Sequence, residues 1–182
     1  LIGHQGHPEV EGTLGQYSSD DAGIYLIETL ADVESLSLKN PKQCALTTQT
    51  TLSVDDTKSI VTAIQQKYPD IMTPKNEDIC YATQNRQDAV KSLAVECDKM
   101  IVVGSPASSN SNRLKELAER LDCPAFLVDD VTQLQREWFQ ETDVIGITAG
   151  ASAAEQCVQH MIKQLRQWGA SAPEERQGVE ET

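Results

Sequence analysis

The sequence contains few aromatic residues, few basic residues and no long apolar run. Aromatic residues make up only 4% of the 182 residues, so we expect a core of Leu, Ile, Val and Ala. The net charge is −13, which argues against a nucleic-acid binder because such a surface repels phosphate backbones. No apolar run approaches the roughly 18 residues of a membrane-spanning helix, and no signal peptide is visible. We therefore predict a cytoplasmic protein that binds neither nucleic acid nor membrane.

The cysteine pattern excludes some kinds of site and leaves others open. The chain has five cysteines and no C-x-x-C pair, which argues against a disulfide framework and fits a reducing compartment. Their spacing alone indicates neither a zinc site nor a ferredoxin-type cluster. Cys80 stands just before a predicted helix, a position that favours the thiolate and hence reactivity or iron ligation. A buried, inert cysteine is the alternative for Cys80, and inert is our prediction for the other four.

Short apolar runs alternate with longer amphipathic runs, which is typical of an α/β fold. We predict two similar αβ lobes with mainly parallel sheets, residues 1–76 and 77–168, followed by a flexible acidic tail, 169–182. The chain has no initiator Met and opens with the pattern of a strand end followed by a loop. We interpret it as a product whose N-terminal part is absent. The predicted strands cover residues 23–27, 44–47, 100–104, 125–128 and 144–148.

Three loops rich in hydroxyl or amide side chains follow predicted strands: Thr48–Thr51, Ser108–Asn110 and Ala149–Ser152. In a parallel α/β sheet such loops gather at one edge, where ligands bind. Helix N-termini there attract phosphate, and neutral side chains add donors. We predict that the three loops share a cavity and hold a diphosphate. The alternative is ordinary helix capping, and Ser152 with Glu155 has the pattern of a capping box.

The loop Gly3–Thr13 places two histidines and two glutamates between glycines. Pro8 suits the first position of a short helix, so His7 and Glu9 would lie at its start. Histidine can donate to a phosphate oxygen or transfer a proton, and Glu9 would donate a proton if burial raised its pKa. A metal site and a solvated turn are the alternatives.

Several segments, in this order, resemble the 4-hydroxy-3-methylbut-2-enyl diphosphate reductase (LytB) family. Each motif is loose by itself, but their order makes the resemblance specific, and it covers most of residues 1–165. The matching segments are Gly3–Thr13, Thr48–Val54, Asp78–Thr83, Gly104–Ser105 with Ser108–Leu114, and Thr148–Ser152.

The resemblance implies a three-lobed αβ enzyme with a central 4Fe–4S cluster held by three cysteines, of which Cys80 is one. It implies that Glu9 delivers protons while two electrons, from a donor such as flavodoxin or ferredoxin, convert the allylic diphosphate to isopentenyl and dimethylallyl diphosphate. This is the last step of the methylerythritol phosphate pathway of isoprenoid biosynthesis. The implied substrate-binding residues are His7, Thr50, Ser108, Ser109, Asn110 and Ser152.

The chain departs from this family because it lacks the first lobe, where the other two cluster cysteines and two further histidines would lie. We therefore predict that the chain by itself holds no intact cluster and has no reductase activity. Two other functions remain as alternatives. One is a redox-free phosphate-ester isomerase with Glu9 as its base, and the other is a phospho-ligand binding module without catalysis.

Overall fold

The computed structural model describes residues 1–17, 23–74 and 78–176. Its contacts divide the chain into a first unit, Leu1–Cys80, and a second unit, Tyr81–Thr182. The boundary predicted near Asn76 lies outside the described residues, as do residues 177–182 of the predicted tail. None of the helices in the described ranges is long and apolar enough to cross a membrane.

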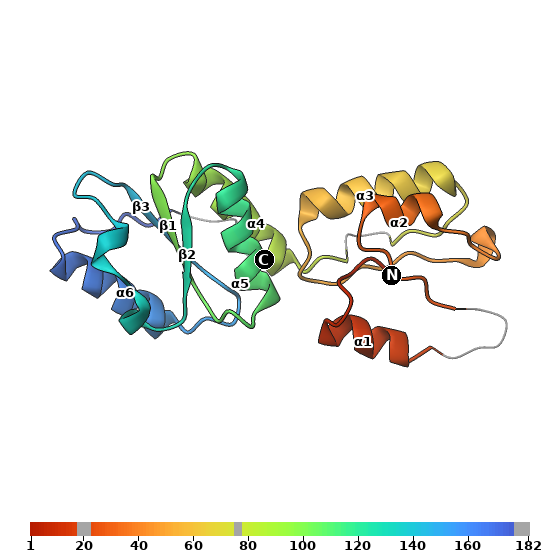
Figure 1. Cartoon of the computed structure of the whole chain (residues 1–182), viewed down its shortest axis with the longest axis horizontal. Coiled ribbons are helices and arrows are strands. Elements are labelled where there is room, and N and C mark those ends of the chain that lie inside the picture. Colours follow the sequence, from red (N-terminus) through yellow and green to blue (C-terminus); the bar gives the residue numbers. More distant parts are fainter. Residues whose placement is uncertain (18–22, 75–77, 177–182) are drawn as a thin grey trace. The chain divides into compact units, whose positions relative to one another are not determined.

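Helices and strands alternate in the second unit, whereas the regular elements of the described part of the first unit are helices (Figure 1). The α/β fold class predicted from the sequence is confirmed. The elements are α1 Pro8–Gly15, α2 Leu30–Ser35, η1 Pro41–Gln43, α3 Val54–Lys67, α4 Tyr81–Ala94, β1 Lys99–Val103, α5 Ser109–Arg120, β2 Ala125–Val128, η2 Val131–Gln133, η3 Arg136–Trp138, β3 Ile145–Ala149 and α6 Glu155–Gln167.

A three-stranded parallel sheet in the order β2-β1-β3 forms the centre of the second unit. Val103, at the end of β1, lies opposite Val128 of β2 and Ala149 of β3, so the three strands end at the same level. Met100 to Val103 are at most 1% exposed, as expected for a central parallel strand covered on both faces.

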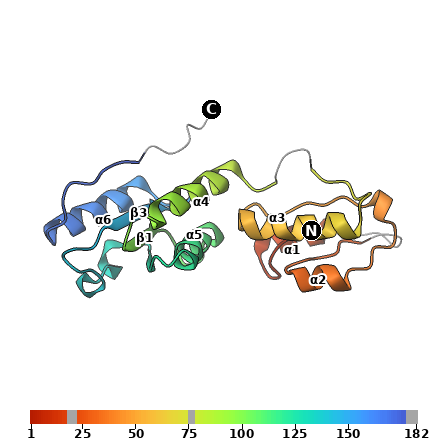
Figure 2. The same ribbon diagram turned by 90° about the horizontal axis from the view of Figure 1, so that it is seen from above.

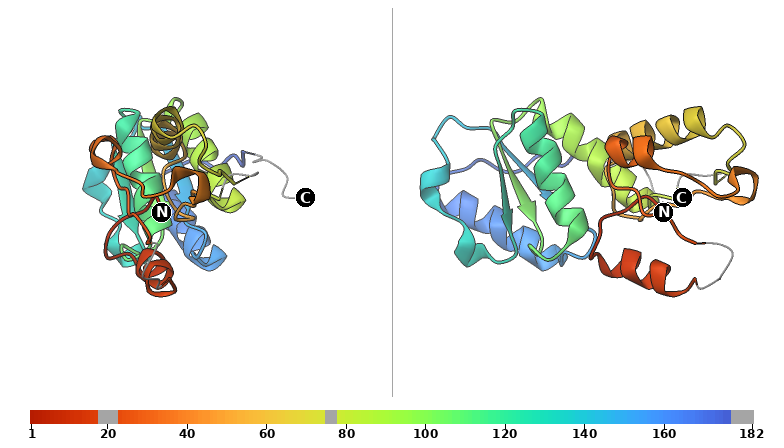
Figure 3. Two further views of the ribbon diagram at one scale, coloured as in Figure 1. Left: turned by 90° about the vertical axis from the view of Figure 1, so that its right-hand side faces the viewer. Right: turned by 45° about the vertical axis from the view of Figure 1, so that its right-hand side comes forward.

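Helices cover both faces of this sheet. On one face, Val90 of α4 and Leu114 of α5 pack with Met100 and Val102. On the other face, Met161 and Leu165 of α6 pack with the two alternate residues of β1, because successive side chains of a strand point to opposite faces. Figures 1 and 3 show α6 on the side of the sheet away from α4 and α5.

The first unit is held together by isolated parallel bridges and by packed helices. Ile2 bridges Ile27 on one side and Thr48 on the other, and Ala45 bridges Met72. The predicted strands at 23–27 and 44–47 are therefore wrong as continuous strands, because each segment pairs over single residues. Figures 1 and 2 show α2 beside α3, and both helices contribute to the core around Ile2.

Candidate functional site

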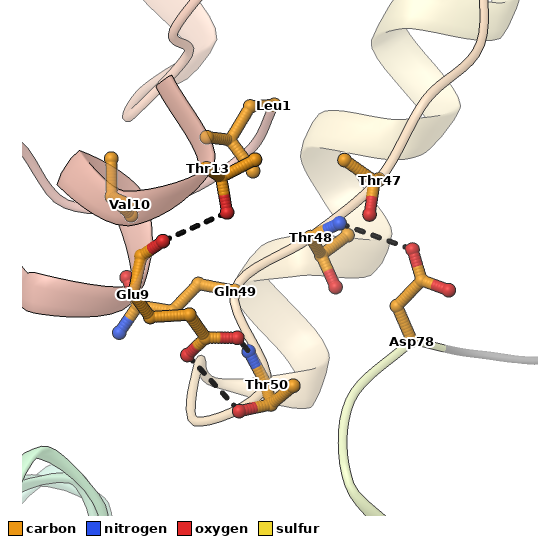
Figure 4. Close-up of a pocket in the computed structure, with 9 residues that line it drawn as sticks. All are labelled: Leu1, Glu9, Val10, Thr13, Thr47, Thr48, Gln49, Thr50 and Asp78. Atoms are coloured by element: carbon orange, nitrogen blue, oxygen red, sulfur yellow. Dashed lines mark hydrogen bonds between the residues drawn. The ribbon is translucent and has the colours of Figure 1, made fainter. Parts of the chain in front are cut away.

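The first unit brings Glu9 of α1 against Thr50, although 41 residues separate them in sequence. One carboxylate oxygen of Glu9 accepts the Thr50 backbone N–H at 3.0 Å, and the other accepts the Thr50 hydroxyl at 3.1 Å (Figure 4). The backbone N–H of Cys80 donates to the Thr50 carbonyl oxygen at 3.1 Å. Three of the residues singled out from the sequence therefore form one hydrogen-bonded group.

His7 starts the helix that carries Glu9. Its ring Nδ1 accepts the backbone N–H of Glu9 at 3.3 Å, and Pro8 is the first residue of α1, as predicted. Because Nδ1 is the acceptor, the proton of the neutral ring belongs on Nε2. Nε2–H is thus available to donate to an anion.

A cavity of about 270 Å³ lies beside the Glu9–Thr50 pair. Its walls carry mainly hydroxyl and carboxyl groups (Figure 4). The Thr48 backbone N–H donates to Asp78 at 3.1 Å, while the Thr48 hydroxyl is buried without a hydrogen-bond partner among the described residues. The lining is polar enough for water or an oxygen-rich ligand. The lining residues are Leu1, Glu9, Val10, Thr13, Thr47, Thr48, Gln49, Thr50 and Asp78.

Gln49 belongs to this arrangement, and the sequence analysis missed it. Its side chain is 1% exposed; its carbonyl oxygen accepts the His4 N–H at 3.0 Å, and its amide donates to the Thr51 hydroxyl at 3.0 Å. It thus links the loop that precedes His7 to the loop that contains Thr50. Its place inside the Thr48–Thr51 loop was the available signal.

The second unit places its predicted loops at the edge where the strands end. The connection after β1 leads to α5 on one face of the sheet, and the connection after β3 leads to α6 on the opposite face. Adjacent parallel strands whose helices leave to opposite faces open a crevice at their carboxyl ends, where ligands of such folds bind. Ser108, Ser109 and Asn110 follow β1, and Ser152 follows β3.

Ser108 caps α5, and Asn110 has a different environment. The Ser108 hydroxyl accepts the Ser111 N–H at 3.3 Å, so Ser108 is the N-cap of α5, and its predicted role in substrate binding stays a prediction. Asn110 is 6% exposed, and neither its amide nitrogen nor its carbonyl oxygen has a hydrogen-bond partner within the described part of the chain. Buried polar groups are nearly always paired. An unpaired amide in the first turn of a helix, at the positive end of the helix dipole, is suited to an anion or its water.

The predicted helix start at Ser152 is wrong. The N–H of Ala153 donates to the Gly150 carbonyl oxygen at 3.0 Å, which closes a turn, and α6 begins at Glu155 with Ala154 as its N-cap. Ser152 lies exposed within that turn. Its hydroxyl is therefore not used as the cap of α6, and its predicted role in substrate binding stays a prediction.

Cys80 differs from the other cysteines, since it is the exposed one. Burial raises the pKa of the Cys97 and Cys123 thiols, and the Cys44 thiol donates to the Asn40 carbonyl oxygen. Over the described ranges, no three His, Cys, Asp or Glu side chains gather as metal ligands. A 4Fe–4S cluster needs more ligands than the one thiol of Cys80 supplies, and the absence of an intact cluster from this chain stays a prediction.

The structure therefore defines an α/β protein in which Glu9, Thr50 and the Cys80 backbone are joined by hydrogen bonds in one unit. In the described part of the other unit, the buried Asn110 amide lies without a partner in the first turn of α5. Comparison with known proteins assigns the family: residues 1–166 match the model of the LytB protein family. The chain belongs to that family.

Relatives named 4-hydroxy-3-methylbut-2-enyl diphosphate reductase match the whole chain. The one from Psychrobacter sp. (strain PRwf-1) is 55% identical and the one from Pseudomonas entomophila (strain L48) is 58% identical. The chain spans 57% and 58% of their lengths. The solved E-1-hydroxy-2-methyl-but-2-enyl-4-diphosphate reductase from Plasmodium falciparum superposes with a TM-score of 0.81 at 36% identity, over 90% of this chain and 51% of that one.

Proposed function

We propose that this chain is the substrate-binding and proton-donating part of a 4-hydroxy-3-methylbut-2-enyl diphosphate reductase. The observation that carries the proposal is the group formed by Glu9, Thr50 and Cys80. It joins a carboxyl group, a hydroxyl that orients it and the backbone of the residue that carries the exposed thiol. The names of the relatives supply the substrate, an allylic alcohol diphosphate.

The second unit would bind the diphosphate. The N-terminus of α5 carries the positive end of the helix dipole, and the buried Asn110 amide offers a side-chain donor without a partner among the described residues. Both attract a phosphate oxygen without any cation, which suits a chain of net charge −13. Ser109 and Ser152 would add hydroxyl donors. The predicted role of His7 in substrate binding stays a prediction.

Glu9 would supply the proton that turns the substrate hydroxyl into leaving water. Thr50 fixes the carboxyl group through two hydrogen bonds, so the acid is oriented before substrate arrives. The balanced reaction consumes two electrons and two protons and releases one water. A 4Fe–4S cluster would supply the two electrons, and Cys80 would provide one of its thiolate ligands. The flavodoxin- or ferredoxin-type donor and the cytoplasmic location stay predictions.

The test uses the full gene product that contains this chain, purified without oxygen. Iron and acid-labile sulfide analysis and turnover of the substrate with a chemical reductant come first. Glu9→Gln should lower kcat by about 10²–10⁴-fold, the usual contribution of a positioned acid, with little change in substrate affinity. Glu11→Gln is the matched control, because Glu11 is exposed on the same helix and its hydrogen bond from the Gly6 N–H survives the change. Equal turnover of the two variants would overturn the role of Glu9.

A further inference from the structure

Two glycines and one serine lie close together where β1 and β3 end. Gly104 and Gly150 directly follow these strands, and their N–H groups donate to Val128 and Val103 respectively. Ser111 of α5 is fully buried, and its hydroxyl has no hydrogen-bond partner in the described ranges. A Cβ atom added to either glycine would lie 2.2 Å from the Ser111 Oγ. Neither glycine has a positive φ, so steric space is the reason for glycine at both positions.

These three residues lie next to the unpaired amide of Asn110. A Cβ atom on Gly150 would lie 3.7 Å from the Asn110 Nδ2, and Asn110 directly precedes Ser111 in the first turn of α5. The depth at which Ser111 seats between the two strand ends therefore fixes the position of the Asn110 amide and of the N-terminus of α5.

We propose that Gly104, Ser111 and Gly150 form a notch that positions Asn110 and the α5 N-terminus for a diphosphate. Ser111 is a positioning residue and makes no contact with the ligand in this proposal. The proposal rests on the proposed function for the identity of the anion. The notch makes these three small residues determinants of anion affinity through geometry alone.

The distances predict that one substitution of Ser111 restores the site in one glycine variant and not in the other. With Ala at position 150, only the Ser111 Oγ is too close, because its Cβ would be at 3.3 Å. With Ala at position 104, the Ser111 Cβ also intrudes, at 2.9 Å. Ser111→Ala should therefore rescue Gly150→Ala and fail to rescue Gly104→Ala. Ser111→Gly removes both atoms and should relieve the clash in either variant.

The first readout is the side-chain amide signal of Asn110 in a nitrogen–proton correlation spectrum of the 182-residue chain, assigned by its loss in Asn110→Leu. Gly104→Ala and Gly150→Ala should both shift this signal, and Ser111→Ala should restore it in the Gly150 variant alone. Gly146→Ala is the control, since the added Cβ meets Cys97 at 2.9 Å instead of Ser111. It should destabilise the protein without moving the signal.

The second readout is the affinity for inorganic diphosphate, measured by calorimetry well below the unfolding temperature. Gly150→Ala should weaken binding at least about tenfold, equivalent to about 1.4 kcal/mol, and the double variant with Ser111→Ala should recover it. An Asn110 signal that does not shift in Gly150→Ala would overturn the proposed notch, as would a tenfold loss of affinity for diphosphate in Ser111→Ala alone. An unmutated chain that fails to bind diphosphate would count against the proposed function, while the spectrum still decides whether the notch exists.

Discussion

Replacing Asn110 by Leu should stabilise the unliganded protein and weaken its binding of diphosphate. The side chain is 6% exposed, and both polar atoms of its amide lack partners among the residues that the structure describes. A buried polar group left unsatisfied costs about 1–3 kcal/mol, and Leu has a similar size without polar atoms. We therefore expect the free energy of unfolding of the second unit to rise by about 1–3 kcal/mol in Asn110→Leu.

Asn112, two residues along the same helix, provides the matched control. Its amide donates to the carbonyl oxygens of Pro106 at 2.6 Å and Ser108 at 2.9 Å. Asn112→Leu breaks both bonds and should lower the free energy of unfolding by about 1–3 kcal/mol. The same substitution thus has opposite signs at two neighbouring positions.

Urea denaturation followed by tryptophan fluorescence measures both effects. The two tryptophans of the chain, Trp138 and Trp168, belong to the second unit, so their emission reports on the unit that contains α5. Calorimetry with inorganic diphosphate gives the affinity of each variant. If Asn110→Leu destabilises the protein as much as Asn112→Leu, the Asn110 amide has a partner in the free protein, and the anion site loses its main support.

Three further predictions concern the core, the pH dependence and the thiols. Leu114→Ala, at a fully buried position between α5 and the sheet, should cost about 2–5 kcal/mol in urea denaturation, and a loss below about 1 kcal/mol would contradict the packing described. The Gln140 N–H and then the Lys99 ammonium group lower the pKa of Asp143. The ionised Asp143 side chain therefore stabilises the fold above the usual Asp pKa of about 4, and this stabilisation is lost as the pH falls through the lowered pKa of the folded state. Urea midpoints between about pH 6 and pH 2 should fall less steeply in Asp143→Asn, and parallel curves would refute this. In thiol labelling of the folded chain, the exposed Cys80 should react first and Cys123, buried with a raised pKa, last; Cys80→Ser should remove the fast phase, and its persistence would place the reactive thiol elsewhere.

Several helix starts, caps and strands could be predicted from the sequence, because neighbouring residues decide them. Pro8 begins α1, Ser108 caps α5, and the apolar run from Met100 gives the central strand. Helix α2 was missed, although its capping box, Thr29 with Asp32, is a sequence signal of the same kind. The start of α6 was predicted wrongly because the residues before Ala154 form a turn, which a hydrogen bond from the Ala153 N–H to the Gly150 carbonyl oxygen closes.

By itself, the sequence determined the α/β class, the family resemblance and the chemical types of the site residues, because periodicity, caps and motifs are properties of consecutive residues. The tertiary structure decided which of these residues meet. It joined Glu9 to Thr50 and Thr50 to Cys80 within the first unit. In the described part of the second unit it left the Asn110 amide buried without a partner and seated Ser111 against two glycines. Such contacts depend on how strands and helices pack across tens of residues, and no local pattern in the chain encodes their distances.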